Sequence, residues 1–195
     1  MVLLFSFRSS VADWYYVPTG SMEPTIQVGD RVVVDKSAYT LELPFTDVVV
    51  AKTGNINRGD IVIIDSNAAE TRLIKRVVAI EGDKVKLENN VLFINGEKAT
   101  VSAKDHNLYS EEILGQTRTI ALNPLPSPAK NFNLITVPRD HVLAMGDNRN
   151  NSVDSRYYGF IPIEEIQGKA NAVAFSLDPD DMYLPRKDRL FTSLY

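Results

Sequence analysis

The apolar runs of this 195-residue chain are short, rich in β-branched side chains and bounded by turn residues. Such runs are typical of strands, and no long segment has apolar side chains at the 3.6-residue period of a surface helix. The pattern therefore predicts a mostly β protein. Strands are predicted at 31–35, 47–52, 60–65, 72–80, 84–88, 91–94, 134–137, 141–145 and 172–175. Short helices are predicted at 109–114 and 163–166.

Turn residues separate these strands in a regular way. The dipeptide Gly-Asp directly precedes three predicted strands, at Gly29, Gly59 and Gly82. Glycine allows the turn and aspartate hydrogen-bonds its own backbone, so the dipeptides are predicted to be turns. Asn89 and Asn90 stand between two predicted strands and indicate a hairpin, because asparagine tolerates positive φ.

Three parts of the chain do not fit the regular strand pattern. Residues 100–133 are polar and irregular, which predicts an inserted lobe or flap, and the segment after Asp178 is expected to be a surface tail. The apolar start at 2–7 stops at Arg8. It is shorter than the roughly 20 residues of a membrane span and lacks the basic start of a signal peptide. The stub of an anchor, an interfacial segment and a first strand all remain open.

Composition excludes several kinds of function. A net charge of −4 and a pI near 5.2 lack the basic footprint of a nucleic-acid binder. Zero cysteines exclude a thiol nucleophile, disulfides, a thiolate zinc site and an iron–sulfur cluster. Two histidines cannot form a three-histidine metal site, and neither lies in an H-E-x-x-H pattern. We therefore expect no cofactor, no metal and no nucleic-acid partner.

A hydrolase of this composition takes its nucleophile from Ser, Thr, Lys or a carboxylate. The segment 18–25 combines two prolines, one glycine and three hydroxyls, so it could hold one hydroxyl in a fixed place. An ordinary turn is the alternative. His106 and His141 lie outside any triad motif, so a catalytic histidine is not expected.

Lys75 is a second candidate, because alternation along the strand 72–80 puts it on one face with Leu73 and Val77. Burial lowers a lysine pKa from ~10.4 by up to 3–5 units. The neutral amine could then take a proton from a serine hydroxyl, and the charge of Arg76 would add to the shift. The alternative is a lysine that extends to water.

The polar segment 146–159 is a third candidate. It follows an apolar strand, and its Asp154 and Arg156 could form a charge-assisted pair that supports a site. A solvated loop is the alternative.

Together these segments resemble the type I signal peptidase (leader peptidase) family, whose members are membrane-associated Ser-Lys dyad endopeptidases. The resemblance spans 18–163 outside the insert and rests on four matches in the family's order. These are Ser21-Met-Glu-Pro-Thr25 with 29–36, Arg58 to Ile64, Arg72 to Asp83, and Gly146 to Pro162.

The resemblance implies a role for each matching residue. Ser21 would be the nucleophile and Lys75 the general base, while the Ser21 N–H and the Thr19 hydroxyl would hold the oxyanion. Ser152 would hold the Lys75 amine, and Asp154 and Arg156 would brace the site with Arg76 nearby. The shallow substrate pockets would be lined by Tyr16, Val17, Pro18, Met22 and Ile74.

The implied fold is an antiparallel β-sheet catalytic core with a smaller inserted β-rich lobe. The core would comprise 15–84 and 138–178, the lobe 85–137, the tail 179–195, and 1–14 a truncated anchor or interfacial segment. The implied partners are preprotein signal peptides with small residues before the cleavage site and a membrane lipid surface. The implied location is the outer face of a bacterial inner membrane. Alternatives are a pilus- or conjugation-type maturation peptidase, a self-cleaving repressor-type Ser-Lys protein, and an inactive β-rich binding module.

Overall fold

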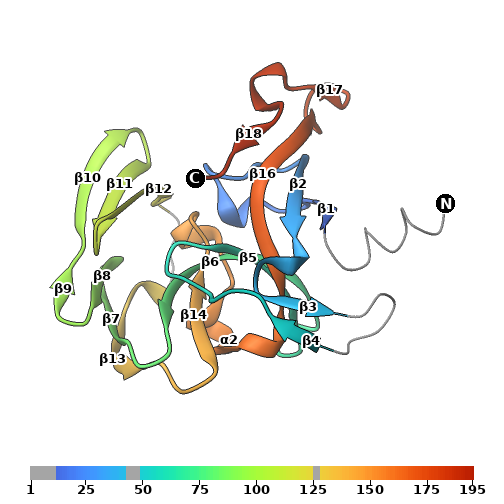
Figure 1. The fold of residues 1–195 in the computed structure, drawn as a ribbon. Coiled ribbons are helices and arrows are strands. Elements are labelled where there is room, and N and C mark those ends of the chain that lie inside the picture. The colour runs from blue at the N-terminus through green and yellow to red at the C-terminus, as the bar shows by residue number, and fades with distance from the viewer. Residues whose placement is uncertain (1–11, 43–48, 125–127) are drawn as a thin grey trace.

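Runs of β-branched residues form one large antiparallel sheet in this computed structural model, which describes residues 12–42, 49–124 and 128–195 (Figure 1). Neighbouring strands hydrogen-bond in the order β1 (Ala12–Tyr16), β2 (Asp30–Asp35), β16 (Ile166–Asp178), β5 (Ile61–Ser66), β6 (Thr71–Ile80), β14 (His141–Met145) and β15 (Ile161–Pro162). Two short strands, β17 (Leu184–Pro185) and β18 (Thr192–Ser193), also pair with β16. The mostly β, antiparallel class predicted from the sequence is therefore confirmed.

The described residues also form smaller sheets. The segment between β6 and β14 forms one sheet from β13 (Phe132–Thr136), β7 (Lys84–Glu88), β8 (Val91–Ile94) and β9 (Glu97–Lys98), and another from β10 (Thr100–Asp105), β11 (Leu108–Ile113) and β12 (Gln116–Ala121). These strands lie to one side in Figure 1. A separate hairpin joins β3 (Thr40–Glu42) and β4 (Val49–Lys52). The described helical turns are η1 (Gly20–Met22), η2 (Lys36–Ala38), η3 (Pro128–Lys130), η4 (Arg149–Asn151), α2 (Ser155–Tyr158), η5 (Ile163–Glu165) and η6 (Lys187–Arg189).

Two expectations for the inserted segment are wrong. Residues 109–114 were expected to be helical and 100–133 irregular, but both contribute to the β10–β12 sheet. The cause is a charged residue in a buried strand position, since Glu111 is fully buried while Glu112 is exposed. Glu111 is neutralised by two arginines, Arg118 and Arg149. Burial raises the Glu111 pKa, but these arginines outweigh it and hold that pKa at about 2. The sequence of β11 therefore lacks the apolar alternation of a strand, because a buried ion cluster takes the place of an apolar residue.

The ends of the chain are described in part. Residues 1–11 of the predicted anchor or interfacial segment, and residues 47 and 48 of a predicted strand, lie outside the described residues. Within the described ranges, no helix has the length and apolar character needed to cross a bilayer. The C-terminal segment predicted to be a tail packs closely on the sheet. Arg189 binds the carboxylate of Asp30 and the carbonyl of Thr25, and Leu194 is buried.

The Gly-Asp turns have the predicted form at three positions. Gly29, Gly59 and Gly82 all have positive φ. Each following aspartate accepts a hydrogen bond from a backbone N–H three residues earlier, on Gln27, Asn57 and Ile80 respectively. Each carboxylate also pairs with a cation, the three partners being Arg189, Lys169 and Arg58. The turns that enter β2, β5 and β7 are therefore locked by charge as well as by backbone geometry.

One apolar cluster joins the main sheet to the inserted strands. Val78 on β6 and Leu143 on β14 pack in the same buried cluster as Leu92 on β8 and Ile113 on β11. Burial of such side chains contributes roughly 1.5–3 kcal/mol each to folding. The strand that carries Lys75 is thus supported from the inserted side, while a second cluster, which includes Met22 and Ile26, supports the loop that carries Ser21.

Candidate active site

Ser21 lies in the single turn η1, in a loop that its own apolar residues fix to the sheet. Met22 and Ile26 on this loop are 1% and 0% exposed, and the Ile26 N–H bonds the Met22 carbonyl at 3.0 Å. Thr19 caps the turn in an extended conformation, and its side chain makes no capping hydrogen bond. The loop therefore holds the Ser21 hydroxyl in place and leaves the nearby Thr19 hydroxyl available to another partner.

Lys75 meets Ser21 from β6. The Lys75 Nζ lies 2.7 Å from the Ser21 Oγ, and Lys75 is only 4% exposed. Burial lowers the Lys75 pKa to about 8; the charge of Asp154 opposes this shift, and Arg156 adds to it. Arg156 thus has the electrostatic influence that was expected of Arg76. Arg76 points elsewhere and binds Asp147 through Nε and the second terminal nitrogen, at 2.9 and 2.7 Å.

Asp154 accepts hydrogen bonds from several polar groups near Lys75. Its Oδ2 accepts the Ser152 hydroxyl at 2.7 Å and the Gly146 N–H at 2.9 Å, and Arg156 binds both of its carboxylate oxygens. Burial acts to raise the Asp154 pKa, but the bonds and charge of Arg156 outweigh it, so the carboxyl is held ionised. Among the described residues, the Ser152 hydroxyl bonds Asp154 and no hydrogen bond joins it to Lys75. The Ser152 oxygen keeps lone pairs with which to accept a hydrogen bond from an amine N–H.

Gly146 allows these groups to come together. A Cβ built at Gly146 would lie 2.3 Å from the Ser152 Oγ and 2.4 Å from the Ser21 carbonyl oxygen. Real Cβ atoms do not approach that closely, so any side chain here would displace the nucleophile loop or Ser152. The glycines of the other three Gly-Asp pairs have positive φ and Gly146 does not, so close approach alone requires glycine at position 146.

The two residues after Gly146 hold the nucleophile loop from behind. Asp147 accepts the Thr25 hydroxyl at 2.6 Å as well as Arg76. Asn148 donates its backbone N–H to the Ser21 carbonyl at 3.1 Å and its side-chain amide to the Gly20 carbonyl at 3.0 Å. One short segment therefore positions both ends of the loop 20–25.

A cavity of about 170 Å³ opens beside the Ser21–Lys75 pair. Four of the five residues predicted to form substrate pockets line it, namely Val17, Pro18, Met22 and Ile74, and the lining also includes Thr19, Thr71, Arg72 and Leu73. The fifth, Tyr16, stacks on Arg31 with the guanidinium 4.4 Å from the ring centre. The cavity is small, and the apolar part of its lining comes from Val17, Pro18, Met22, Leu73 and Ile74.

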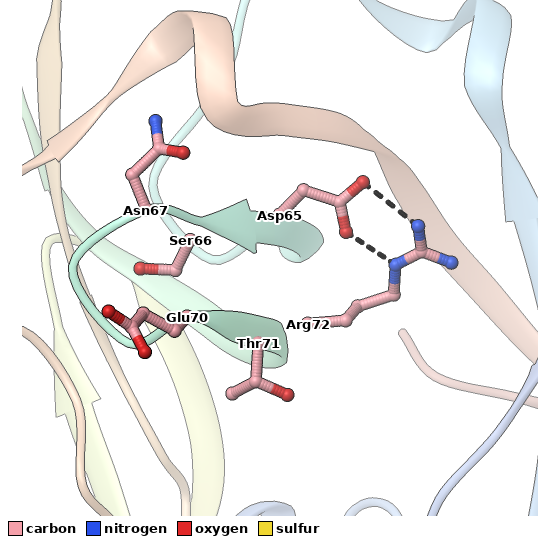
Figure 2. Close-up of a pocket in the computed structure, with 6 residues that line it drawn as sticks. All are labelled: Asp65, Ser66, Asn67, Glu70, Thr71 and Arg72. Atoms are coloured by element: carbon pink, nitrogen blue, oxygen red, sulfur yellow. Dashed lines mark hydrogen bonds and ion pairs between the residues drawn. The ribbon is translucent and has the colours of Figure 1, made fainter.

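A larger hollow of about 490 Å³ continues along the β5–β6 turn and shares Thr71 and Arg72 with the first. Figure 2 shows its polar lining, in which Arg72 faces Asp65 across the hairpin and binds both carboxylate oxygens. Neither Ser21 nor Lys75 lines this hollow, so its size does not make it the place of the chemistry.

A family model described as "Signal peptidase, peptidase S26" matches residues 1–175. The chain belongs to this family. It is therefore a serine endopeptidase, a hydrolase of the signal peptidase type.

Individual relatives agree with the family. The chain is 32% identical over 211 residues to signal peptidase I of Pseudomonas fluorescens, covering 97% of this chain and 74% of that protein. It is 31% identical over 176 residues to probable signal peptidase I-2 of Synechocystis, covering 87% and 66%. A signal peptidase I crystal structure from Enterococcus faecalis matches with a TM-score of 0.40 and 26% identity, over 59% of this chain and 96% of that one. The chain thus spans about two thirds to three quarters of the length of the first two relatives.

Several members of this signal peptidase site had no role assigned from sequence. Gly146, Asp147 and Asn148 were visible only as part of a polar run, and Thr25 only as a turn hydroxyl. Their partners are far away in the chain, with Thr25 and Asp147 separated by 122 positions. The density of hydrogen-bonding side chains after an apolar strand was the one available signal.

Proposed function

We propose that this signal peptidase removes N-terminal signal peptides from secreted preproteins, with Ser21 as nucleophile and Lys75 as general base. The observation that carries the proposal is the 2.7 Å contact between the Lys75 Nζ and the Ser21 Oγ in a buried setting. A lysine pKa near 8 leaves a useful fraction of neutral amine at mildly alkaline pH.

The proposed reaction needs two proton transfers for each acyl transfer. The Ser21 Oγ attacks the scissile carbonyl carbon while its proton passes to the Lys75 Nζ. The resulting ammonium protonates the leaving amine as the C–N bond breaks, which leaves an acyl ester on Ser21. Lys75, neutral again, takes a proton from water as the hydroxide attacks the ester carbonyl carbon. The bond from that carbon to the Ser21 Oγ then breaks, the Lys75 ammonium returns the proton to the Ser21 Oγ, and the signal peptide leaves with a new carboxyl end.

Oxyanion stabilisation is assigned to the Ser21 N–H and the Thr19 hydroxyl. Thr19 is exposed beside the cavity and makes no capping hydrogen bond, which supports a role in binding substrate. Preorganised donors of this kind stabilise the charge that develops in the transition state.

The signal peptide is proposed to bind as an added strand. β14 pairs with β6 only from Arg76 onward, so within the described chain the edge of 71–75 opposite β5 has no strand partner. An extended peptide can hydrogen-bond to such an edge while alternate side chains enter pockets. The cavity of about 170 Å³ supports a preference for small residues before the cleavage site.

Action at a membrane surface is also part of the proposal. Large apolar side chains are exposed on one side of the sheet, where Tyr16 and Phe175 both lie opposite Arg31 in register. Tyr16 is 42% and Phe175 40% exposed, and Trp14 on the same face is 58% exposed. Aromatic side chains of this kind suit a lipid interface. The proposed location is the outer face of a bacterial inner membrane.

Cleavage of a purified preprotein tests the catalytic assignment. Wild type is compared with Ser21→Ala and Lys75→Ala, and Lys84→Ala on β7 is the control because Lys84 is exposed. Both active-site variants should lose cleavage while the control keeps it. Near-normal cleavage by either active-site variant would show that the dyad is wrongly assigned.

Sedimentation with anionic phospholipid vesicles tests the membrane surface. The double variant Trp14→Ser, Phe175→Ser should bind vesicles more weakly than wild type, with cleavage of a short soluble peptide preserved. Equal binding by both proteins would assign lipid contact to another part of the chain.

A further inference from the structure

The side chain of Asn148 bridges the inserted lobe and the nucleophile loop. Its Nδ2 donates to the Gly20 carbonyl at 3.0 Å, and its Oδ1 accepts the Asn123 Nδ2 at 2.9 Å. Asn148 is 2% exposed. Because a carbonyl oxygen can only accept a hydrogen bond, the Gly20 contact determines which way the Asn148 amide faces.

The Gly20 carbonyl belongs to the same peptide unit as the Ser21 N–H. A trans peptide is planar, and its C=O and N–H point in opposite directions. The carbonyl is held by two donors, the Asn148 amide at 3.0 Å and the Glu23 N–H at 3.2 Å. Pinning the oxygen on one side therefore sets the direction of the Ser21 N–H on the other side.

The lobe continues this chain of amides. The Asn150 Nδ2 donates to the Asn123 carbonyl at 2.6 Å, and the Asn90 Nδ2 donates to the Asn150 Oδ1 at 3.1 Å. Backbone contacts run alongside, since the Ala121 N–H at the end of β12 bonds the Asp147 carbonyl at 2.9 Å. The side chain of Asn148 is thus held from the β10–β12 sheet, on the side away from Gly20.

We propose that Asn148 is a positioning residue that aims the Ser21 N–H at the oxyanion, and that Asn123 of the inserted lobe orients Asn148 for this task. The proposal rests on the proposed function, in which that N–H is an oxyanion donor. It gives the lobe a part in transition-state stabilisation through one amide contact, without any contact between the lobe and the reacting atoms.

Asn148→Ala tests the proposal because it removes the Gly20 contact and keeps the backbone bond to the Ser21 carbonyl. Loss of one oxyanion donor lowers turnover by about 10²–10³. A donor that is present but no longer aimed should lower kcat by about 10- to 100-fold, with KM changed less than about threefold. A peptide aldehyde that forms a tetrahedral adduct with Ser21 should lose affinity by a similar factor. Uncleaved substrate should bind Ser21→Ala equally well with or without Asn148→Ala.

A second variant and a control keep this result interpretable. Asn123→Ala lies one residue farther from Ser21, and we expect it to lower kcat in the same direction by a smaller factor. Asn57→Ala removes another amide-to-carbonyl bond, Asn57 Nδ2 to the Asn55 carbonyl at 3.0 Å, at an exposed site away from Ser21. Its kcat should match wild type.

The outcomes separate the inference from the proposed function. A kcat within twofold of wild type for Asn148→Ala, or a rise in KM alone, overturns the positioning role. A displaced acid limb of the pH–rate profile also overturns it, because the effect would then act through Lys75. Retained cleavage by Ser21→Ala would instead overturn the proposed function itself.

Discussion

Arg156 grips Asp154 with both arms of its guanidinium, Nε to Oδ1 and a terminal nitrogen to Oδ2, each at 2.8 Å. Both side chains are almost fully buried, at 1% and 0% exposed. The pair lies beside Lys75, and its two charges act on the lysine in opposite directions: Asp154 raises the Lys75 pKa and Arg156 lowers it.

Asp154→Asn and Arg156→Met should therefore move the acid limb of the pH–rate profile in opposite directions. Removing the anion lowers the Lys75 pKa, so the limb moves to lower pH, whereas removing the cation moves it to higher pH. Either change leaves one buried charge without its partner and should cost about 3–5 kcal/mol of stability. Shifts in the same direction would contradict this account of the site.

Wild-type activity should rise as pH increases through about 8, the pKa of Lys75. The free energy of unfolding depends on the same ionisation of Lys75. The Lys75 pKa in the folded protein lies below the unfolded value of 10.5. Below about pH 8, Lys75 is therefore protonated in both the folded and the unfolded state, and the folded state bears the full free-energy cost of a buried ammonium. That cost disappears as pH rises toward 10.5.

Lys75→Met should consequently be inactive yet more stable than wild type at neutral pH. We expect a gain of up to about 3 kcal/mol, measured by urea denaturation, that shrinks at alkaline pH. Lys84→Met, at an exposed position, is the control and should show no pH-dependent gain. A variant less stable than wild type at every pH would contradict the burial argument.

Thr19→Val should keep the fold and lose turnover. Thr19 is exposed and its hydroxyl caps no helix, so stability should stay within about 0.5 kcal/mol of wild type. Loss of one oxyanion donor should lower kcat by about 10²–10³. Thr100→Val on β10 provides the same chemical change away from Ser21 and should leave kcat intact; an unaffected Thr19→Val would remove the hydroxyl from the proposed oxyanion site.

Gly146→Ala should abolish most activity, because the new methyl group would lie 2.3 Å from the Ser152 Oγ and 2.4 Å from the Ser21 carbonyl oxygen. Gly96→Ala is the matched control. Its Cβ would meet nothing within 4 Å, although φ is +88° there. The control should lose about 1 kcal/mol of stability to backbone strain and keep its kcat. Equal kcat for the two variants would argue against the close approach.

Arg189→Ala should destabilise the protein strongly although it lies six residues from the C-terminal Tyr195. It leaves the fully buried Asp30 without a cation and frees the Thr25 carbonyl. A loss of about 3–5 kcal/mol is expected by denaturant unfolding. Arg139→Ala, which breaks an exposed pair with Asp140, should cost less than about 1 kcal/mol. Similar losses of stability in the two variants would show that the C-terminal segment does not stabilise the fold through Arg189.

The strands of the main sheet were predictable because they are short runs rich in β-branched residues and bounded by turn residues. β2, β5, β6 and β14 bury Val, Ile and Leu side chains at the expected positions. β11 escaped prediction because its inward position is Glu111, whose burial depends on arginines 7 and 38 residues away. Local periodicity carries no trace of such distant neutralisation.

In the site, too, local sequence patterns could be used for prediction and contacts between distant residues could not. Local sequence context made Lys75 and the hydroxyls of 18–25 candidates, and the family resemblance singled out Ser21. The structure brings Ser21 and Lys75 together across 54 positions. The electrostatic influence on Lys75 was placed on its chain neighbour Arg76, but successive strand residues face opposite sides of a sheet. Arg156, 81 positions later in the sequence, takes that place. Only the three-dimensional structure shows that Arg156, and not Arg76, lowers the Lys75 pKa.

The carboxylate shared by Arg118 and Arg149 affects how the molecule opens. Glu111 is fully buried, and it joins the β10–β12 sheet to the loop that holds Asn148. If the β10–β12 sheet separated from the rest of the protein, the buried Glu111 carboxylate would lose an arginine partner. Partial unfolding of this sheet is therefore energetically disfavoured. Amide hydrogens of β11 should then exchange with deuterium only as fast as those of β6. The inserted segment and the proteolytic centre would lose their structure at the same temperature, in one cooperative step.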